Sequence, residues 1–94
     1  GEEFLILFLG YTRKQAGKIL EGMLTNFRNQ EYDFLPEDVI ITFSAGFTYL
    51  DNKNIDVEGF IKCADEALYY SKEHGRNQIT YYNDLRLRDM QVNR

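Results

Sequence analysis

The chain of 94 residues has one cysteine, fewer basic than acidic residues and no long apolar run. Because Cys63 is the only cysteine, no internal disulfide can form, and its place in a helical apolar pattern indicates a buried structural thiol. Eleven basic residues against fifteen acidic ones give a net charge of −4, which gives no support to nucleic-acid binding. A small phosphate-bearing ligand is not excluded, because it needs only local positive charge.

The apolar stretches are far shorter than the ~20 residues that a membrane-spanning helix needs, and no signal-peptide pattern is present. We therefore expect a cytoplasmic segment with no direct membrane contact, although the parent protein could carry an anchor upstream. Apolar residues make up 44% of the chain and aromatic residues 15%. This composition predicts a packed globular unit, either one domain or part of one.

The first apolar stretch covers residues 4–9 and does not alternate with polar residues. A run of this length is typical of a strand that is buried on both faces, although a helix cannot be excluded from periodicity alone. Gly10 ends it. Such a strand belongs in the interior of a sheet and needs a neighbour on each side, so we expect further strands beside it.

A helix is predicted over residues 13–29. Thr12 and Gln15 have the spacing of a capping box, which satisfies free N–H groups at a helix start. Apolar residues then recur at intervals of three and four, as in an amphipathic helix: Ala16, Ile19, Leu20, Met23, Leu24 and Phe27. Gly17 and Gly22 lie off this stripe, and the pattern gives no reason for either of them.

A polar loop with the only proline, Pro36, leads to residues 39–49, which alternate as in a long strand. One face is large and apolar: Val39, Ile41, Phe43, Ala45, Phe47 and Tyr49. The other face is smaller and more polar: Ile40, Thr42, Ser44, Gly46 and Thr48. Gly46 in mid-strand predicts either a bulge or a close approach of another backbone.

A polar turn over residues 51–54 precedes Asp56, which is a suitable N-cap for a second helix. Gly75 is placed to end that helix in the left-handed conformation. A short strand is predicted over residues 78–82, and residues 83–94 form a tail or linker. The predicted order is β-α-β-α-β, an α/β (α+β) fold with right-handed crossovers.

Two groups of side chains could carry chemistry. Glu2 and Glu3 follow Gly1 at the mouth of the first strand, and paired carboxylates suit a hard cation such as Mg²⁺. A solvated chain end has the same composition. Lys72 and Arg76 lie four residues apart at the end of the second helix and could hold a polyphosphate together. Cations that only complement the helix dipole are the alternative.

Four segments in this order resemble the signatures of the GGDEF family, the diguanylate cyclases. They are Gly1 to Phe4, Ser44 to Gly46, Ala64 to Tyr69, and Lys72 with Gly75 to Asn77. The resemblance covers residues 1–82 and implies the C-terminal part of a GGDEF domain, with residues 83–94 outside it. It implies a nucleotidyl-cyclase-like, ferredoxin-like antiparallel sheet with packed helices. Ser71 stands where the family usually has alanine.

Members of that family are nucleotidyltransferases of bacterial signalling. They condense two GTP molecules to cyclic di-GMP with release of pyrophosphate. The resemblance implies a homodimer with Mg²⁺ (or Mn²⁺), in which Gly1 lines the nucleotide. Glu2 and Glu3 would bind metal and act in catalysis, and Lys72 and Arg76 would hold the GTP phosphates.

Other parts of the family's site lie ahead of the signature at Gly1: a metal-binding aspartate, guanine-reading residues and an Arg-x-x-Asp inhibitory site. The family sheet also has a strand between residues 4–9 and 39–49 that this sequence does not contain. We therefore expect the 94 residues alone to be inactive. The alternative is a catalytically inactive GGDEF module that binds nucleotide or dimerises in signalling.

Overall fold

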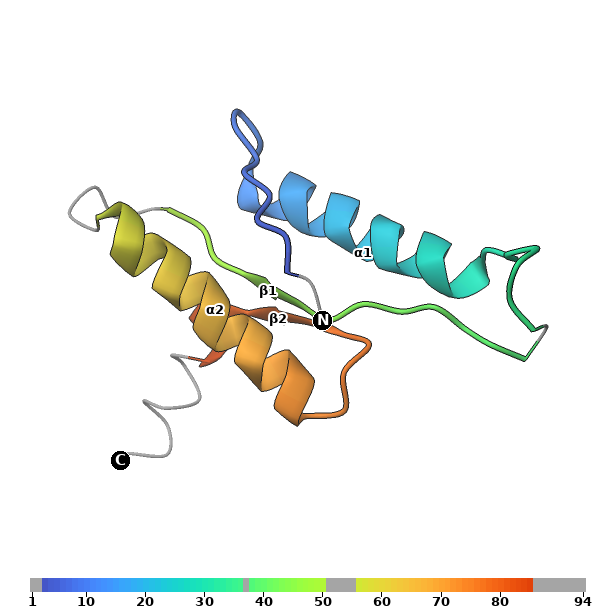
Figure 1. The fold of residues 1–94 in the computed structure, drawn as a ribbon. Helices are drawn as coiled ribbons and strands as arrows, with labels where there is room; N and C mark the ends of the chain where they lie inside the picture. Colours follow the sequence, from blue (N-terminus) through green and yellow to red (C-terminus); the bar gives the residue numbers. More distant parts are fainter. Residues whose placement is uncertain (1–2, 37, 51–55, 86–94) are drawn as a thin grey trace.

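The computed structural model describes residues 3–36, 38–50 and 56–85, and its labelled elements are two helices and two short strands (Figure 1). In chain order they are α1 (Arg13–Asn29), β1 (Ala45–Phe47), α2 (Val57–Glu73) and β2 (Ile79–Tyr81). Some predictions fall outside the described residues: Gly1, Glu2, the turn over 51–54 and the tail from residue 86. No helix in the described part is long and apolar enough to cross a membrane.

The strands β1 and β2 pair in parallel, with Gly46 opposite Thr80 in the centre of the register. Parallel neighbours cannot be joined by a tight turn, so the chain crosses over between them through α2. The mixed helix-and-strand class is as predicted. The sheet in the described residues is parallel and two-stranded, and it does not show the antiparallel, ferredoxin-like arrangement.

Both helices begin and end where the sequence predicts. At the start of α1, Thr12 Oγ1 accepts a hydrogen bond from Gln15 N at 3.1 Å, and Gln15 Oε1 accepts one from Thr12 N at 2.9 Å. At the start of α2, Asp56 Oδ1 accepts a hydrogen bond from Gly59 N at 2.7 Å. Gly75 follows α2 with a φ of 108°, a conformation in which glycine has no Cβ clash.

The two faces of β1 pack against different helices. Because successive side chains of a strand point to opposite faces, Phe47 and its neighbour Gly46 face opposite ways. The Phe47 face is covered by α1. The cluster around Phe47 contains Ala16, Leu20 and Met23 of α1, Ile79 and Tyr81 of β2, and Phe8 from the segment before α1. The Phe27 ring of α1 also packs edge-on against Phe43, with centroids 5.5 Å apart. The predicted large face of residues 39–49 is therefore the face that contacts α1.

On the small face, α2 lies directly against the backbone of β1 (Figure 1). A Cβ at Gly46 would fall onto the backbone atoms Leu68 N and Ala64 O, so only glycine fits there. Of the two explanations that the sequence left open for Gly46, the close backbone approach is correct. Fully buried Ser71 joins α2 to both strands, since its Oγ donates to Ala45 O at 2.8 Å and lies 2.7 Å from Thr80 Oγ1.

Gly17 is part of the core, although the helical pattern placed it off the apolar stripe. It is buried under the ring of Tyr81, and a Cβ there would lie 3.2 Å from the Tyr81 hydroxyl oxygen. That hydroxyl donates a hydrogen bond to Glu21 Oε1 at 2.9 Å. Gly17 therefore leaves room for a contact between α1 and β2, which no local pattern reveals.

The predicted strand over residues 4–9 is wrong for this chain. The segment forms no strand, and most of its side chains are exposed: 84% for Phe4, 70% for Leu5 and 65% for Leu7, whereas Phe8 is partly buried against the core. A strand is stable only when its backbone N–H and C=O groups have partners, and no described residue pairs with this segment. The observed order is α-β-α-β. For the same reason the predicted strand over 39–49 is reduced to β1, because β2 offers only three residues for pairing.

Candidate functional site

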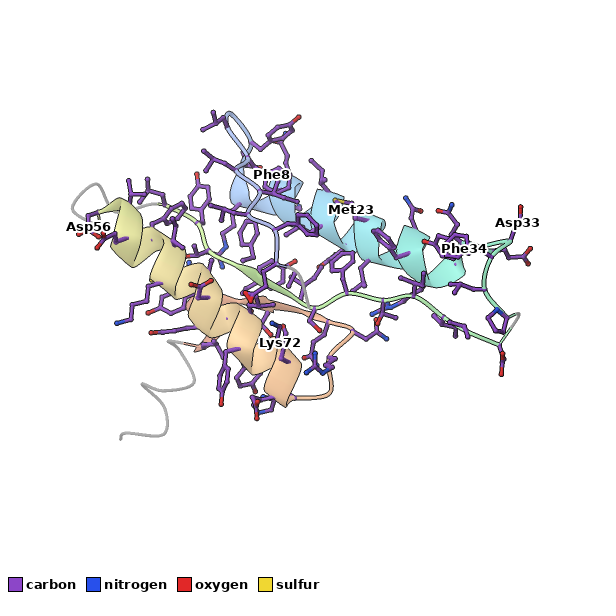
Figure 2. All side chains as sticks on the ribbon, in the orientation of Figure 1. Phe8, Met23, Asp33, Phe34, Asp56 and Lys72 are labelled. Atoms are coloured by element: carbon purple, nitrogen blue, oxygen red, sulfur yellow. The ribbon has the colours of Figure 1, made fainter. Side chains whose placement is uncertain are left out.

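The structure brings together one member of each predicted chemical group. Lys72 lies in the last turn of α2, where Figure 2 labels it, and its Nζ is 3.6 Å from Glu3 Oε2. The two side chains are partly exposed, 35% for Lys72 and 58% for Glu3. Exposed ion pairs contribute only about 0–1 kcal/mol to stability. The pair matters here because of its position: it brings a basic and an acidic side chain from distant parts of the sequence together.

Arg76 lies beyond the end of α2 rather than on a continued helix, so its four-residue spacing from Lys72 is not a helical one. Its backbone is in the left-handed region, with a φ of 61°, which is uncommon for a residue with a long side chain. Two hydrogen bonds hold it there. Arg76 N donates to Ser71 O at 2.9 Å, and Arg76 O accepts from Gln78 Nε2 at 3.1 Å. The side chain is exposed.

The next residue, Asn77, is held by α1 and by the segment that leads into β1. Arg28, in the last turn of α1, donates from Nε to Asn77 Oδ1 at 2.7 Å and from Nη2 to Asn77 O at 2.9 Å. Asn77 N donates to Ser44 Oγ at 3.1 Å. Asn77 is also left-handed, with a φ of 51°. Sequence reasoning missed Arg28, since no local signal links it to a residue 49 positions away.

Glu3 is the described member of the predicted carboxylate pair, because Glu2 and Gly1 lie outside the described residues. Within the described ranges, no three His, Cys, Asp or Glu side chains gather in a way that could hold a metal ion. Mg²⁺ typically uses one or two carboxylates together with substrate phosphates. An exposed carboxylate such as Glu3 could provide one ligand of that kind.

Two other residues carry side chains that can act chemically, His74 and Cys63. The His74 ring stacks on Tyr70 with centroids 3.6 Å apart, and its Nδ1 lies 2.9 Å from the Tyr70 carbonyl oxygen. These contacts fix an exposed side chain just beyond the helix end. Cys63, which the sequence predicted to be a buried thiol, is a half-buried free thiol in α2. Neither residue belongs to the cluster around Lys72 and Glu3.

The family model of the diguanylate cyclase GGDEF domain matches residues 1–78. The chain belongs to the GGDEF family. The matched residues contain every member of the candidate site: Glu3, Arg28, Ser44, Lys72, Arg76 and Asn77. The site thus lies wholly within the part of the chain that is typical of a GGDEF domain.

Curated relatives of this GGDEF chain include named diguanylate cyclases. Diguanylate cyclase A of Treponema denticola is 28% identical over 83 residues, which are 85% of this chain and 22% of the relative. Diguanylate cyclase DgcP of Pseudomonas aeruginosa is 30% identical over 79 residues, 84% of this chain and 12% of the relative. An uncharacterised membrane protein of Staphylococcus saprophyticus is 30% identical over 83 residues, 86% of this chain and 23% of the relative.

The GGDEF chain thus spans a quarter or less of the curated relatives that it matches, from 12% to 25% of their length. No solved structure is significantly similar to it.

Proposed function

We propose that this chain forms part of a diguanylate cyclase domain that condenses two GTP molecules to cyclic di-GMP and pyrophosphate. The observation that carries the proposal is the 3.6 Å approach of Lys72 Nζ to Glu3 Oε2, within a chain of the GGDEF family. Phosphoryl transfer depends on positioning and on electrostatic stabilisation of the phosphates. A carboxylate and a cation at one point can serve both needs, because the carboxylate can bind a metal ion and the cation can bind phosphate.

The basic and the acidic residues of the site have different proposed roles. Lys72 and Arg76 hold the terminal phosphates of GTP, which neutralises the charge that develops on departing pyrophosphate. Glu2 and Glu3 are the ligands for Mg²⁺ (or Mn²⁺), and Gly1 lines the nucleotide without a side chain. When bound, the cation polarises a phosphoryl oxygen and lowers the pKa of a coordinated hydroxyl. The carboxylate of Glu3 leaves Lys72 when phosphate arrives, because the phosphate carries more negative charge.

The wider setting is also a proposal. Two copies of the complete domain each hold one GTP, which gives a homodimer around the reacting pair. Residues 1–82 belong to this domain, and residues 83–94 are a tail or linker. The domain works in the cytoplasm. Two relatives are described as membrane proteins, which supports a parent protein that is anchored elsewhere in its sequence.

The experiment is a set of variants in the intact protein that carries this domain, with cyclic di-GMP formation as the readout. We expect Glu3→Ala to lower kcat about 100-fold or more, because a metal ligand in the transition state is lost. Its matched control is Glu73→Ala, an exposed acidic residue at the end of α2. Unchanged turnover of Glu3→Ala would refute the metal role.

Lys72→Ala should raise the KM for GTP about tenfold, since it removes a charge-assisted contact to phosphate. Lys62→Ala, an exposed lysine of the same helix, is the control and should leave the KM unchanged. We expect the 94-residue chain alone to form no product. GTP binding by the intact protein without any cyclic di-GMP formation would favour the inactive nucleotide-binding module.

A further inference from the structure

The guanidinium of Arg28 makes a forked contact with the loop that follows α2. Its Nε donates to Asn77 Oδ1 at 2.7 Å and its Nη2 donates to Asn77 O at 2.9 Å, while Asn77 N donates to Ser44 Oγ at 3.1 Å. We refer to Arg28, Asn77 and Ser44 as the latch. It fixes the side chain, the carbonyl and the amide of Asn77 at once, from α1 and from the segment before β1.

The latch lies next to a stretch of backbone in an uncommon conformation. Gly75, Arg76 and Asn77 have φ values of 108°, 61° and 51°, three consecutive residues in the left-handed region. Glycine adopts this conformation freely and asparagine tolerates it, but Arg76 does not favour it. Strained residues persist only where the surrounding structure holds them, and such residues concentrate at ligand sites. The contacts of Asn77 provide that restraint immediately after Arg76.

We propose that Arg28 is a positioning residue for phosphate binding, which acts through Asn77 to hold the backbone of Arg76 in the left-handed conformation. This inference rests on the proposed role of Arg76 toward GTP. Without the latch, the loop can leave the left-handed conformation, and GTP binding then has to order the loop as well as make the contacts. A cation that only complements the dipole at the end of α1 needs no such geometry. The fork of Arg28 onto one residue is what separates the two roles.

The first test is Arg28→Lys in the intact protein that carries this domain, with GTP affinity measured by calorimetry. Lysine retains the charge but lacks the fork, so we expect about fivefold weaker GTP binding. Arg13→Lys makes the same change at the other end of α1 and should leave the affinity unchanged. Equal affinity of Arg28→Lys and the unaltered protein would overturn the proposal.

The second test is a double-mutant cycle with Arg76→Ala. If Arg28 acts through Arg76, Arg28→Lys should cause no further loss of GTP affinity once Arg76 is absent. Additive losses overturn the positioning role, because a general effect of Arg28 on folding or charge would persist without Arg76. If Arg76→Ala alone leaves GTP affinity unchanged, the proposed phosphate role of Arg76 is wrong and the inference fails with it.

A second variant covers the case in which Arg28→Lys does not fold. Asn77→Gly allows the left-handed backbone without strain and removes the Oδ1 acceptor for Arg28. We expect about threefold weaker GTP binding while Arg76 is present, and no change in the Arg76→Ala background. Unchanged GTP affinity of Asn77→Gly with Arg76 present would also overturn the proposal.

Discussion

Apolar side chains occur both in the labelled helices and strands and in residues 3–9, but all of the buried ones lie in the helices and strands. Ala67 and Ser71 in α2 are fully buried, whereas Phe4 is 84% exposed and Leu9 is 75% exposed. Hydrophobicity alone does not account for this difference. The parallel pair β1 and β2 gives α2 a backbone surface to pack on, and residues 3–9 have no such partner in the described part of the chain. An apolar stretch is buried only where its backbone is also satisfied.

The candidate site takes one residue type from each region. Lys72 is held by the packed region, at the end of a capped helix. Glu3 comes from the exposed segment and reaches Lys72 across 3.6 Å. Lys72 therefore lies on a packed helix, and Glu3 does not. We expect changes in the packed region to alter stability first, and changes near Glu3 to alter chemistry first.

The largest effect on stability is expected from Gly46→Ala in the packed region. The new Cβ would meet backbone atoms of Leu68 and Ala64, which cannot move as a side-chain tip can. We expect the free energy of unfolding to fall by about 3 kcal/mol or more, because overpacking against backbone forces α2 away from β1. Chemical denaturation of the 94-residue chain, followed by circular dichroism, measures this loss.

Gly22→Ala is the matched control for this substitution. Gly22 is an exposed residue of α1, and a Cβ there would meet nothing within 4 Å. Alanine lowers the backbone entropy of the unfolded chain and favours the helix, so we expect stabilisation of about 0.5–1 kcal/mol. The account fails if the two substitutions change the free energy of unfolding in the same direction.

A paired truncation compares the two regions directly. Leu24 of α1 is 4% exposed and Leu5 is 70% exposed. Leu24→Ala should lower the free energy of unfolding by about 2–3 kcal/mol, since it removes buried methyl groups and leaves a cavity. Leu5→Ala should change it by less than about 0.5 kcal/mol. Similar losses from both substitutions in the 94-residue chain would show that residues 3–9 are buried in solution.

The smallest effect concerns pH and the contact of Tyr81 with α1. Burial raises the pKa of the Tyr81 hydroxyl from 10.0 to about 12, and the hydrogen bond to Glu21 and the Glu21 charge add to this. The folded state therefore keeps the proton over a pH range in which the unfolded state loses it. Stability from this group is fully present below pH 10 and is lost as pH rises toward 12.

Tyr81→Phe tests this assignment, because phenylalanine keeps the ring and has no proton to lose. We expect the free energy of unfolding of the unaltered chain to fall more steeply between pH 10 and 12 than that of the variant. The measured quantity is the difference between the two curves, because the substitution changes only the Tyr81 hydroxyl. Parallel curves would contradict both the burial of the Tyr81 hydroxyl and its contact with Glu21.

Local signals predicted the helices almost to the residue. The capping box of Thr12 and Gln15, the N-cap at Asp56 and the terminator at Gly75 each depend on residues close in sequence. The strand over residues 4–9 could not be judged in the same way, because a strand depends on a partner that local sequence does not specify. The alternation over residues 39–49 correctly predicted which face is large, but not that only Ala45–Phe47 finds a partner.

The candidate site, too, could be predicted from the sequence only in part. The sequence resemblance selected Glu3, Lys72 and Arg76, and the structure brings Lys72 to Glu3. The left-handed backbone at Arg76 and the contact of Arg28 with Asn77 could not be predicted, since they arise only when α1 packs beside the loop after α2. The proposed positioning role of Arg28 is thus accessible from the structure alone.

Conversion of GTP by the intact protein that carries this domain tests the central claim most directly. With Mg²⁺ present and Glu2, Glu3, Lys72 and Arg76 unaltered, we expect cyclic di-GMP and pyrophosphate to accumulate, and a chelator to stop both. Chromatography of the products measures this. Tight GTP binding with no cyclic di-GMP at any Mg²⁺ or Mn²⁺ concentration would contradict the claim that this site is catalytic.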